Sequence, residues 1–413
     1  MPKFEAPRGT QDILPAQQPL WDRVIRGAEG LCSAYGYRRI TTPIFEDTEL
    51  FTRTSGEGSD IVQKEMYTFT DRGDRSLTLR PEATAPVARA YIEHGLHREP
   101  QPVKTFFIGP IYRYSAPQRG KYREFWQLNV EAMGSDDPAI DAEIIQLYGE
   151  LLNRLGIEGA WLELNSIGDR NCRPAYLDQL NAWLDEHASE LDEETLAKRT
   201  TSPLRVFDNL PQKPEAVQRA LGEAPKIGES LCEECQAHFD AVRRYLDAYG
   251  VEYRLVPTLV RGLDYYTRTT FEFMADALGA QLSLAGGGRY DYLIEEIGGP
   301  PTPAVGIASG LERLVLSLQQ QGVDAEPPTI DVFFAVEDAA ARPEVLAALA
   351  DLRRRGRAAD TDYAGRSLRG QLTQAGRLGA GVTLIVHADG ATLRRAGEKD
   401  EQFPSLAEAV ASL

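Results

Sequence analysis

Apolar residues near the start of the chain recur every three to four positions. Leu20, Val24 and Leu31 fall on one face at this spacing, which predicts an N-terminal helix. Residues 39–45 are typical of a strand. Pro43 removes one amide donor from that strand and so indicates an edge, a bulge or an interface.

Two further strands are predicted at 105–114 and 125–133, joined by a turn that contains Pro117 and Gly120. A helix should follow at once. Asp137 and a proline supply its N-cap and first position, an apolar stripe continues to Leu155, and the next glycine ends it.

Residues 170–250 are mostly helical, polar and acidic, and strand-like sequence resumes at 251–288. We therefore expect a helical insertion in a sheet that continues on both sides. A helix at about 308–319 closes this region, and 322–328, with paired prolines, is the predicted linker.

Beyond the linker, strands alternate with helices. The strands are expected at 331–336, about 357–363 and 382–387, and the helices at 343–355 and 367–377. This alternation predicts a small α/β domain with a largely parallel sheet. Since 413 residues exceed one ordinary core, we expect a first domain over 1–325, with its insertion at about 170–250, and a second over 326–413.

Charge is unevenly distributed between these two domains. Residues 330–413 carry 11 Lys/Arg and 12 Asp/Glu, which leaves 34 basic and 50 acidic residues before them. The second domain also has a basic cluster at 353–357. Clusters of this kind are more often solvated helix ends than RNA sites, so charge alone does not identify a partner.

The chain has neither an apolar run long enough to span a membrane nor the layout of a signal peptide at its start. Its four cysteines are too few and too scattered for a disulfide framework, which predicts a reducing cytoplasm. Cys232 and Cys235 form a single C-x-x-C pair, with His238 nearby and no second pair. A structural zinc ion requires four ligands, so we expect no metal there.

The segment from Arg261 to Thr267 places a cation, an anion and two phenols within seven residues. Strand-like sequence flanks it at 253–260 and 269–273. A continuous strand would direct alternate side chains to opposite faces, so that Arg261 and Tyr266 face apart. An edge strand with a solvated salt bridge is the ordinary explanation for such a cluster.

Two other segments carry cations in suggestive places. Residues 112–127 hold four, and Arg113 sits at a strand end, where a guanidinium can grip two phosphate oxygens. Residues 306–314 form a small-residue strand end that runs into a helix carrying Arg313. Solvent-exposed arginines would explain both segments equally well. Neither a P-loop nor a Rossmann fingerprint is present in the sequence.

Taken together, these segments resemble one family. Arg261–Thr267 matches the histidine-binding signature of histidyl-tRNA synthetases residue for residue, while 112–127 resembles motif 2 and 306–314 motif 3 of class II aminoacyl-tRNA synthetases. Thr78–Thr84 and Ala285–Asp291 match further loops of the family. The resemblance implies an α+β fold: a class II antiparallel sheet flanked by helices, a helical insertion and a C-terminal α/β anticodon-binding domain.

The resemblance also implies roles for individual residues. Arg113 would bind the α-phosphate of ATP, Phe125 would stack on adenine and Arg313 would hold the γ-phosphate, with Mg²⁺ accompanying ATP. Arg261 would approach the α-phosphate opposite Arg113. Histidine binding is assigned to Glu82, Thr84, Gln127, Glu131, Tyr265, Tyr266 and Tyr290. Within this set, Glu82, Thr84 and Gln127 would hold the α-amino group, and Glu131 and Tyr266 the two imidazole nitrogens.

The implied activity is that of a histidine–tRNA ligase acting on histidine, ATP and tRNA(His). The implied assembly is a homodimer with Pro43 near the interface, and no DNA partner is expected. Ser115 departs from the family's usual glutamate, Trp126 from a common histidine, and 387–402 from the usual tail. These departures keep open a rival, a histidine-binding regulatory paralogue that partners an ATP phosphoribosyltransferase. A synthetase for another amino acid conflicts with Glu131, Tyr266 and Tyr290 together.

Overall fold

The computed structural model describes residues 4–413 except 57–58, 117–119, 209, 278–279 and 324–328. The chain divides into two compact units, one of residues 1–12 and 21–324 and the other of residues 13–20 and 325–413. Two predicted segments lie partly outside the described residues. They are the linker at 322–328 and the turn at 115–124 between the two predicted strands. Within the described ranges, no helix is long and apolar enough to cross a membrane.

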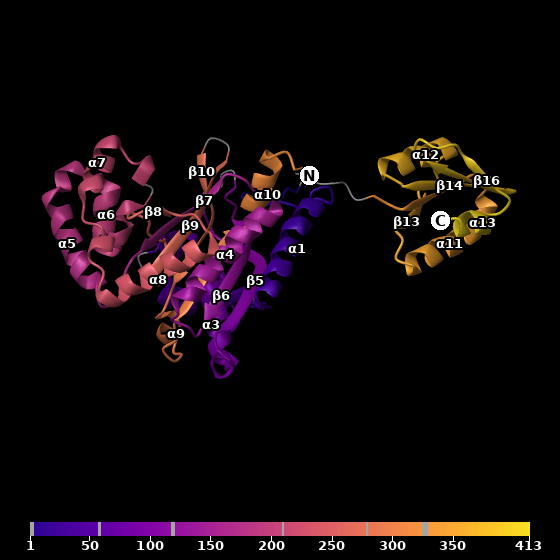
Figure 1. Ribbon diagram of the computed structural model, residues 1–413. Coiled ribbons are helices and arrows are strands. Elements are labelled where there is room, and N and C mark those ends of the chain that lie inside the picture. The colour runs from indigo at the N-terminus through magenta and orange to yellow at the C-terminus, as the bar shows by residue number, and fades with distance from the viewer. Residues whose placement is uncertain (1–3, 57–58, 117–119, 209, 278–279, 324–328) are drawn as a thin grey trace. The chain divides into compact units, whose positions relative to one another are not determined.

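An eight-stranded sheet forms the body of the first unit (Figure 1). In spatial order its strands are β1 (Arg38–Arg39), β5 (Val103–Tyr112), β6 (Glu124–Met133), β11 (Ala304–Gly310), β10 (Ala280–Arg289), β9 (Thr267–Ala277), β7 (Ala160–Ser166) and β8 (Arg254–Leu255). Among the described residues of this sheet, the edge pairs β1–β5 and β7–β8 are parallel and the other pairs are antiparallel. A second, antiparallel sheet has the order β2 (Phe45–Asp47), β4 (Ser76–Leu79) and β3 (Tyr67–Thr70).

The strands at the centre of the sequence prediction are confirmed. β5 and β6 pair antiparallel from Val103 opposite Met133 to Tyr112 opposite Glu124. The predicted strand at 39–45 is wrong in one respect, because β1 ends before Pro43 and β2 begins after it. Proline cannot donate to a ladder, so the chain leaves one sheet there and enters the other.

Helices α1 (Gln18–Ala34) and α4 (Pro138–Leu155) are also confirmed. The Asp137 side chain accepts a hydrogen bond from the amide of Ala139 at the start of α4, and Gly156 ends it in a left-handed conformation, φ 81°. The remaining helices of the sheet region are α2 (Thr48–Ser55), α3 (Thr84–Glu93), α9 (Leu293–Glu296) and α10 (Leu311–Gln320). α10 begins later than predicted because residues 304–310 extend the sheet as β11.

Between β7 and β8 lie four helices: α5 (Arg173–Glu186), α6 (Glu193–Thr201), α7 (Glu215–Glu223) and α8 (Glu233–Tyr249). Short helical turns occur along the whole chain, at Ile61–Glu65, Leu96–Arg98, Ala188–Glu190, Pro203–Phe207, Leu210–Gln212, Ile227–Glu229 and Ala339–Ala341.

The last helix of the insertion, α8, returns to the sheet and lies beside α4 (Figure 1). Leu180 and Leu221 of the insertion share one apolar cluster with Tyr265, Tyr266 and Tyr290. The insertion core therefore reaches the sheet where the sequence predicts the amino-acid site.

The second unit is a five-stranded sheet with helices on both faces. Its order is β13 (Ala359–Thr361), β12 (Val332–Val336), β14 (Val382–His387), β15 (Gly390–Arg395) and β16 (Glu401–Phe403). Alternate residues of β12 face α11 (Arg342–Arg354) and α13 (Leu406–Ala411) on one side, and α12 (Leu368–Arg377) on the other. The first three strands are parallel as predicted, whereas β15 and β16 are antiparallel additions.

Candidate active site

A cavity of about 350 Å³ lies against the neighbouring strands β6, β10 and β11. Every predicted site residue except Glu131 lines it, namely Glu82, Thr84, Arg113, Phe125, Gln127, Arg261, Tyr265, Tyr266, Tyr290 and Arg313. These residues come from segments up to about 230 positions apart. The fold therefore brings the separate sequence motifs to one place.

Residues 261–266 form an irregular turn, so the predicted strand with alternating faces is wrong. β8 covers only Arg254–Leu255 and β9 begins at Thr267. The physical reason is topological. β8 and β9 lie on opposite sides of β7, so the connection must cross the end of that strand. As a result, Arg261 and Tyr266 line the same cavity, with the guanidinium carbon 6.0 Å from the ring centroid.

Arg261 is held by a carboxylate that the sequence reasoning missed. Its Nη1 lies 3.0 Å from Oε1 of Glu272 on β9. Burial acts to lower the pKa of Arg261, but Glu272 and the Tyr266 hydroxyl raise it above its ordinary value. Gly286 on β10 makes room for this group, since a Cβ there would overlap the guanidinium. The one available signal for Glu272 was its charge among the apolar residues and threonines of the predicted strand 269–273.

Arg113 and Arg313 face the same cavity. The Nε of Arg113 donates to the Pro81 carbonyl at 2.7 Å, and its guanidinium carbon lies 5.5 Å from the centre of the Phe125 ring. Arg313 donates to the carbonyls of Ser283 and Gly120. Burial lowers the pKa of Arg313, and Arg113 lowers it further, while Glu272 acts against both. This part of the cavity is therefore suited to an anion with several oxygens.

A chain of hydrogen bonds forms the opposite part of the cavity. The Glu82 carboxylate accepts from the amides of Thr84, at 2.7 Å, and Ala85, at 2.8 Å, in the first turn of α3. The Thr84 hydroxyl donates to Oε1 of Glu131 at 2.7 Å. The Tyr290 hydroxyl donates to Oε2 of the same carboxylate at 2.6 Å. Each carboxylate is thus fixed before any ligand arrives.

Glu131 lies directly behind the wall of the cavity and is 1 % exposed. Gly306, which lines the cavity, has no Cβ that would overlap this carboxylate. Burial raises the pKa of Glu131 to about 7, against the hydrogen bonds from Tyr290 and Thr84. Tyr265 and Tyr290 complete the wall, with their ring centroids 5.8 Å apart. Burial also raises the pKa of both phenols, so they remain neutral donors.

Several buried polar atoms that line the cavity have no hydrogen-bond partner among the described residues. They are Oγ of Ser115, Oε1 of Gln127, Oδ1 of Asn129 and Nε of Arg261. Buried polar atoms are normally paired, so this set indicates a ligand with complementary groups. Glu312 also lines the cavity and was not anticipated. It accepts from the Trp126 amide at 2.9 Å, and burial raises its pKa to about 7.

Away from this cavity, the expectation that Cys232 and Cys235 lie alone is wrong. Asp169 and Cys172 join them, with the four potential ligand atoms all within 4.8 Å of one another. His238 is directed elsewhere, since its Nε2 lies 3.5 Å from Oδ2 of Asp141. Because about 60 residues separate the two pairs, only the folded insertion could reveal their proximity.

Comparisons with known proteins agree on one family. The family described as histidyl-tRNA synthetase matches residues 9–314. The histidine–tRNA ligase of Natranaerobius thermophilus is 46 % identical over 384 residues, which cover 92 % of this chain and 90 % of that protein. The histidine–tRNA ligase of Desulforamulus reducens is 48 % identical over 382 residues, with coverage of 92 % and 90 %. The crystal structure of apo S. aureus histidyl-tRNA synthetase has a TM-score of 0.83 at 36 % identity and covers 99 % of each chain.

Proposed function

The chain belongs to the histidyl-tRNA synthetase family, and we infer from this premise that it is a histidine–tRNA ligase. It activates histidine with ATP and transfers the histidyl group to the 3′ end of tRNA(His). One observation carries the inference: a single cavity has Arg113, Arg261 and Arg313 on one side and a chain of carboxylates and phenols on the other. The first side suits phosphates, and the second suits an amino acid with an ammonium group and an imidazole.

On the phosphate side, we assign the α-phosphate of ATP to Arg113 and Arg261. The γ-phosphate is assigned to Arg313 and the adenine ring to Phe125. The support is that all four side chains line the cavity and that the arginines are held by carbonyls and one carboxylate. Fixed guanidiniums can stabilise charge that develops on the phosphorus without having to reorganise.

On the histidine side, Glu82, Thr84 and Gln127 would hold the α-amino group. Glu131 would reach one imidazole nitrogen past Gly306, which has no side chain to cover its carboxylate. Tyr266 would contact the other nitrogen, with Tyr265 and Tyr290 as the surrounding wall. The free Oε1 of Gln127 supports the first assignment, and the buried carboxylate behind Tyr290 supports the second. A misfit side chain would leave these buried groups unpaired, which can discriminate by ~10⁴–10⁵.

The reaction then proceeds in two displacements. The histidine carboxylate, already ionised at neutral pH, attacks the α-phosphorus, and pyrophosphate leaves to give histidyl-adenylate. A hydroxyl of the terminal tRNA ribose next attacks the acyl carbon, and AMP leaves. Mg²⁺ would bind with ATP as a counter-ion. Among the residues of the cavity, Glu312 offers it a carboxylate oxygen, Oε2, that is buried without a partner in the described chain.

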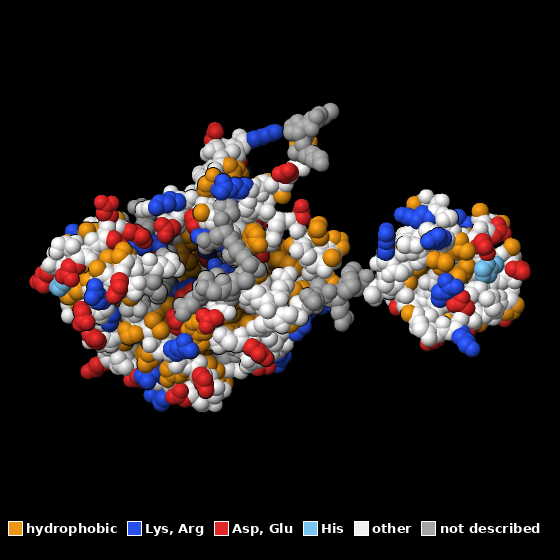
Figure 2. All heavy atoms as spheres, turned by 90° about the horizontal axis from the view of Figure 1, so that it is seen from above, with side chains coloured by type: hydrophobic (Ala, Val, Ile, Leu, Met, Phe, Trp, Pro, Cys, Tyr) orange, Lys and Arg blue, Asp and Glu red, His pale blue; other side chains and the backbone are white. Residues whose placement is uncertain are grey.

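The C-terminal unit would bind the anticodon, and Figure 2 shows Lys and Arg side chains together with Asp and Glu on its visible face. A homodimer is supported by three exposed apolar side chains, Ile44, Phe45 and Phe69, with exposed fractions of 45, 45 and 42 %. The first two directly follow Pro43, and Phe69 lies on strand β3. Sedimentation analysis of Phe45→Asp tests the dimer, and an unchanged mass would exclude this face. Cytoplasmic location and the lack of a DNA partner remain predictions.

Histidine-dependent exchange between ATP and labelled pyrophosphate, followed by charging of a tRNA(His) transcript, tests the function. We expect both activities. Exchange without charging would restrict the defect to tRNA handling, where Ser115 and residues 387–402 depart from the family. Histidine binding without exchange would instead support the regulatory paralogue and overturn the inference.

A further inference from the structure

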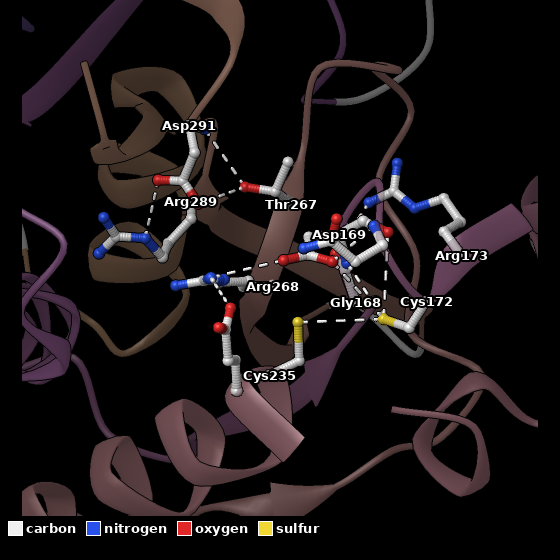
Figure 3. A network of polar contacts seen from close by, with 11 residues as sticks. Gly168, Asp169, Cys172, Arg173, Cys235, Thr267, Arg268, Arg289 and Asp291 are labelled. Carbon is white, nitrogen blue, oxygen red and sulfur yellow. Dashed lines mark hydrogen bonds and ion pairs between the residues drawn. The ribbon is translucent and has the colours of Figure 1, made fainter. Parts of the chain in front are cut away.

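Two pairs of potential metal ligands meet beside the start of β9. Figure 3 shows three of the four side chains, those of Asp169, Cys172 and Cys235. Asp169 and Cys172 form one pair, and Cys232 and Cys235 the other, each with two intervening residues. Cys172 and Cys232 are the N-caps of α5 and α8, and Cys235 lies in the first turn of α8. Two such pairs with a spacing of two residues are typical of structural zinc sites.

We propose that these four side chains form a structural site for one zinc ion, with three cysteine sulfurs and one carboxylate oxygen as ligands. Tetrahedral zinc with bonds of ~2.3 Å places two sulfurs ~3.8 Å apart. The sulfurs of Cys172 and Cys235 are 3.9 Å apart, and Oδ1 of Asp169 lies 3.8 Å from the Cys172 sulfur. A disulfide would require about 2.05 Å. Three soft sulfur ligands select zinc over magnesium or calcium.

The surroundings compensate the negative charge of such a ligand set. The N-termini of α5 and α8 point their partial positive charge at it. Nη2 of Arg268 lies 3.4 Å from Oδ2 of Asp169 (Figure 3). It also lies 3.8 Å from a carboxylate oxygen of Glu234. The Asn171 amide donates to Oδ1 of Asp169 at 2.9 Å, so the carboxylate is oriented in advance.

Backbone conformation also makes room for the site. Gly168 has φ +61°, and a Cβ there would lie 2.6 Å from the Cys172 sulfur. Cys232 is partly exposed, which leaves a path for the ion, whereas the other three ligands are buried.

The position of the site gives it a structural role near the histidine pocket. Nη2 of Arg173, the residue after Cys172, donates to the carbonyls of Gly168 at 3.1 Å and Tyr266 at 2.7 Å. The amide of Arg268 donates to the Gly168 carbonyl at 2.7 Å. An ion bound here would join the first turns of α5 and α8 to the strand that directly follows Tyr266.

The test is the zinc content of the untagged, full-length chain after dialysis without chelator, measured by mass spectrometry of the metal together with a thiol titration. We expect about one zinc per chain and four free thiols in the denatured protein. Co²⁺ in place of zinc should give the intense absorption of tetrahedral thiolate coordination. Cys235→Ser should lose the metal. Cys32→Ala, which removes the one cysteine outside the cluster, should retain it.

A second variant guards against misfolding of Cys235→Ser. Asp169→Asn preserves volume and should remain folded, with zinc affinity lowered by at least about 10-fold in competition with a chromogenic chelator. The inference is overturned if the reduced parent chain takes up no zinc from an equimolar solution. It is equally overturned if Cys235→Ser keeps the metal, or if two of the cluster thiols prove to be a disulfide.

Discussion

The two sides of the cavity are held in place in opposite ways. On the phosphate side, Arg113 and Arg313 are held mainly by backbone carbonyls, and Arg261 by the single carboxylate of Glu272. On the histidine side, the carboxylate of Glu82 is bound by two donors from the chain and that of Glu131 by three. Positive charge is thus in excess on one side, while the other is a nearly closed hydrogen-bond network.

This difference indicates how each side would contribute to the reaction. Excess positive charge is compensated only when phosphates bind, and most strongly when charge develops on the phosphorus. A closed network instead fixes the shape and polarity of a pocket in advance, which favours selective binding. Substitutions on the phosphate side should therefore lower the rate, and substitutions on the histidine side should lower affinity.

The largest expected effect is that of Arg261→Ala. Removing a guanidinium that faces the reacting phosphorus should lower kcat for pyrophosphate exchange by about 10³-fold, or about 4 kcal/mol. Histidine affinity, followed by tryptophan fluorescence, should change by less than about 3-fold. Arg254→Ala is the matched control, because that exposed arginine of β8 lies over Trp161 of β7. Equal losses in rate and affinity would exclude Arg261 from transition-state stabilisation.

The next largest effect distinguishes two buried glutamates whose pKa values are raised to the same extent. Burial raises the pKa of Glu131 and of Glu312 from 4.5 to about 7. The folded state therefore holds a proton that the unfolded state releases near pH 4.5. This stabilisation is complete below pH 4.5 and is lost as the pH rises through 7, at most ~3 kcal/mol for each group.

Glu131→Gln and Glu312→Gln should each remove the contribution of that glutamate to the pH dependence of the free energy of unfolding. The free energy of unfolding at pH 5 and pH 7.5 is measured by tryptophan fluorescence, since all four tryptophans lie before residue 325. Only Glu131→Gln should also weaken histidine binding, by about 10-fold at pH 7.5, because it alters a charged hydrogen-bond acceptor. If Glu312→Gln weakened binding equally, the division of the cavity into two sides would fail.

Much of the fold followed from sequence pattern because the signals were local. The proline and aspartate at the start of α4 and the glycine after it act within one turn, and the structure has the helix where they predict it. β15 and β16 carried no comparable signal, since both strands are short and the segment 388–403 is mostly polar. Their pairing depends on β14, which the local sequence does not reveal.

The site divides in the same way. Its members were predicted through resemblance, and the structure brings all but Glu131 to the surface of one cavity. The prediction of a continuous strand at 261–266 was wrong, because the order of the strands in the whole sheet makes this segment cross the end of β7. Glu272 and the partners of Cys235 were missed for a related reason: each is defined by contacts between distant segments.

The smallest expected effect tests the phosphate side without removing any charge. Gly286→Ala adds a Cβ that would overlap the Arg261 guanidinium, the mobile end of a long side chain, so the chain should still fold. The guanidinium must then shift slightly to avoid the added methyl group. Misplacement of a catalytic group lowers the reaction rate more than it lowers substrate binding. We expect pyrophosphate exchange to fall by about 10-fold at nearly constant histidine affinity. Gly222→Ala, where an added Cβ meets nothing within 4 Å, controls for the glycine substitution itself. A loss of histidine affinity in Gly286→Ala would mean that Arg261 also shapes the pocket, and that the two sides are coupled through Tyr266.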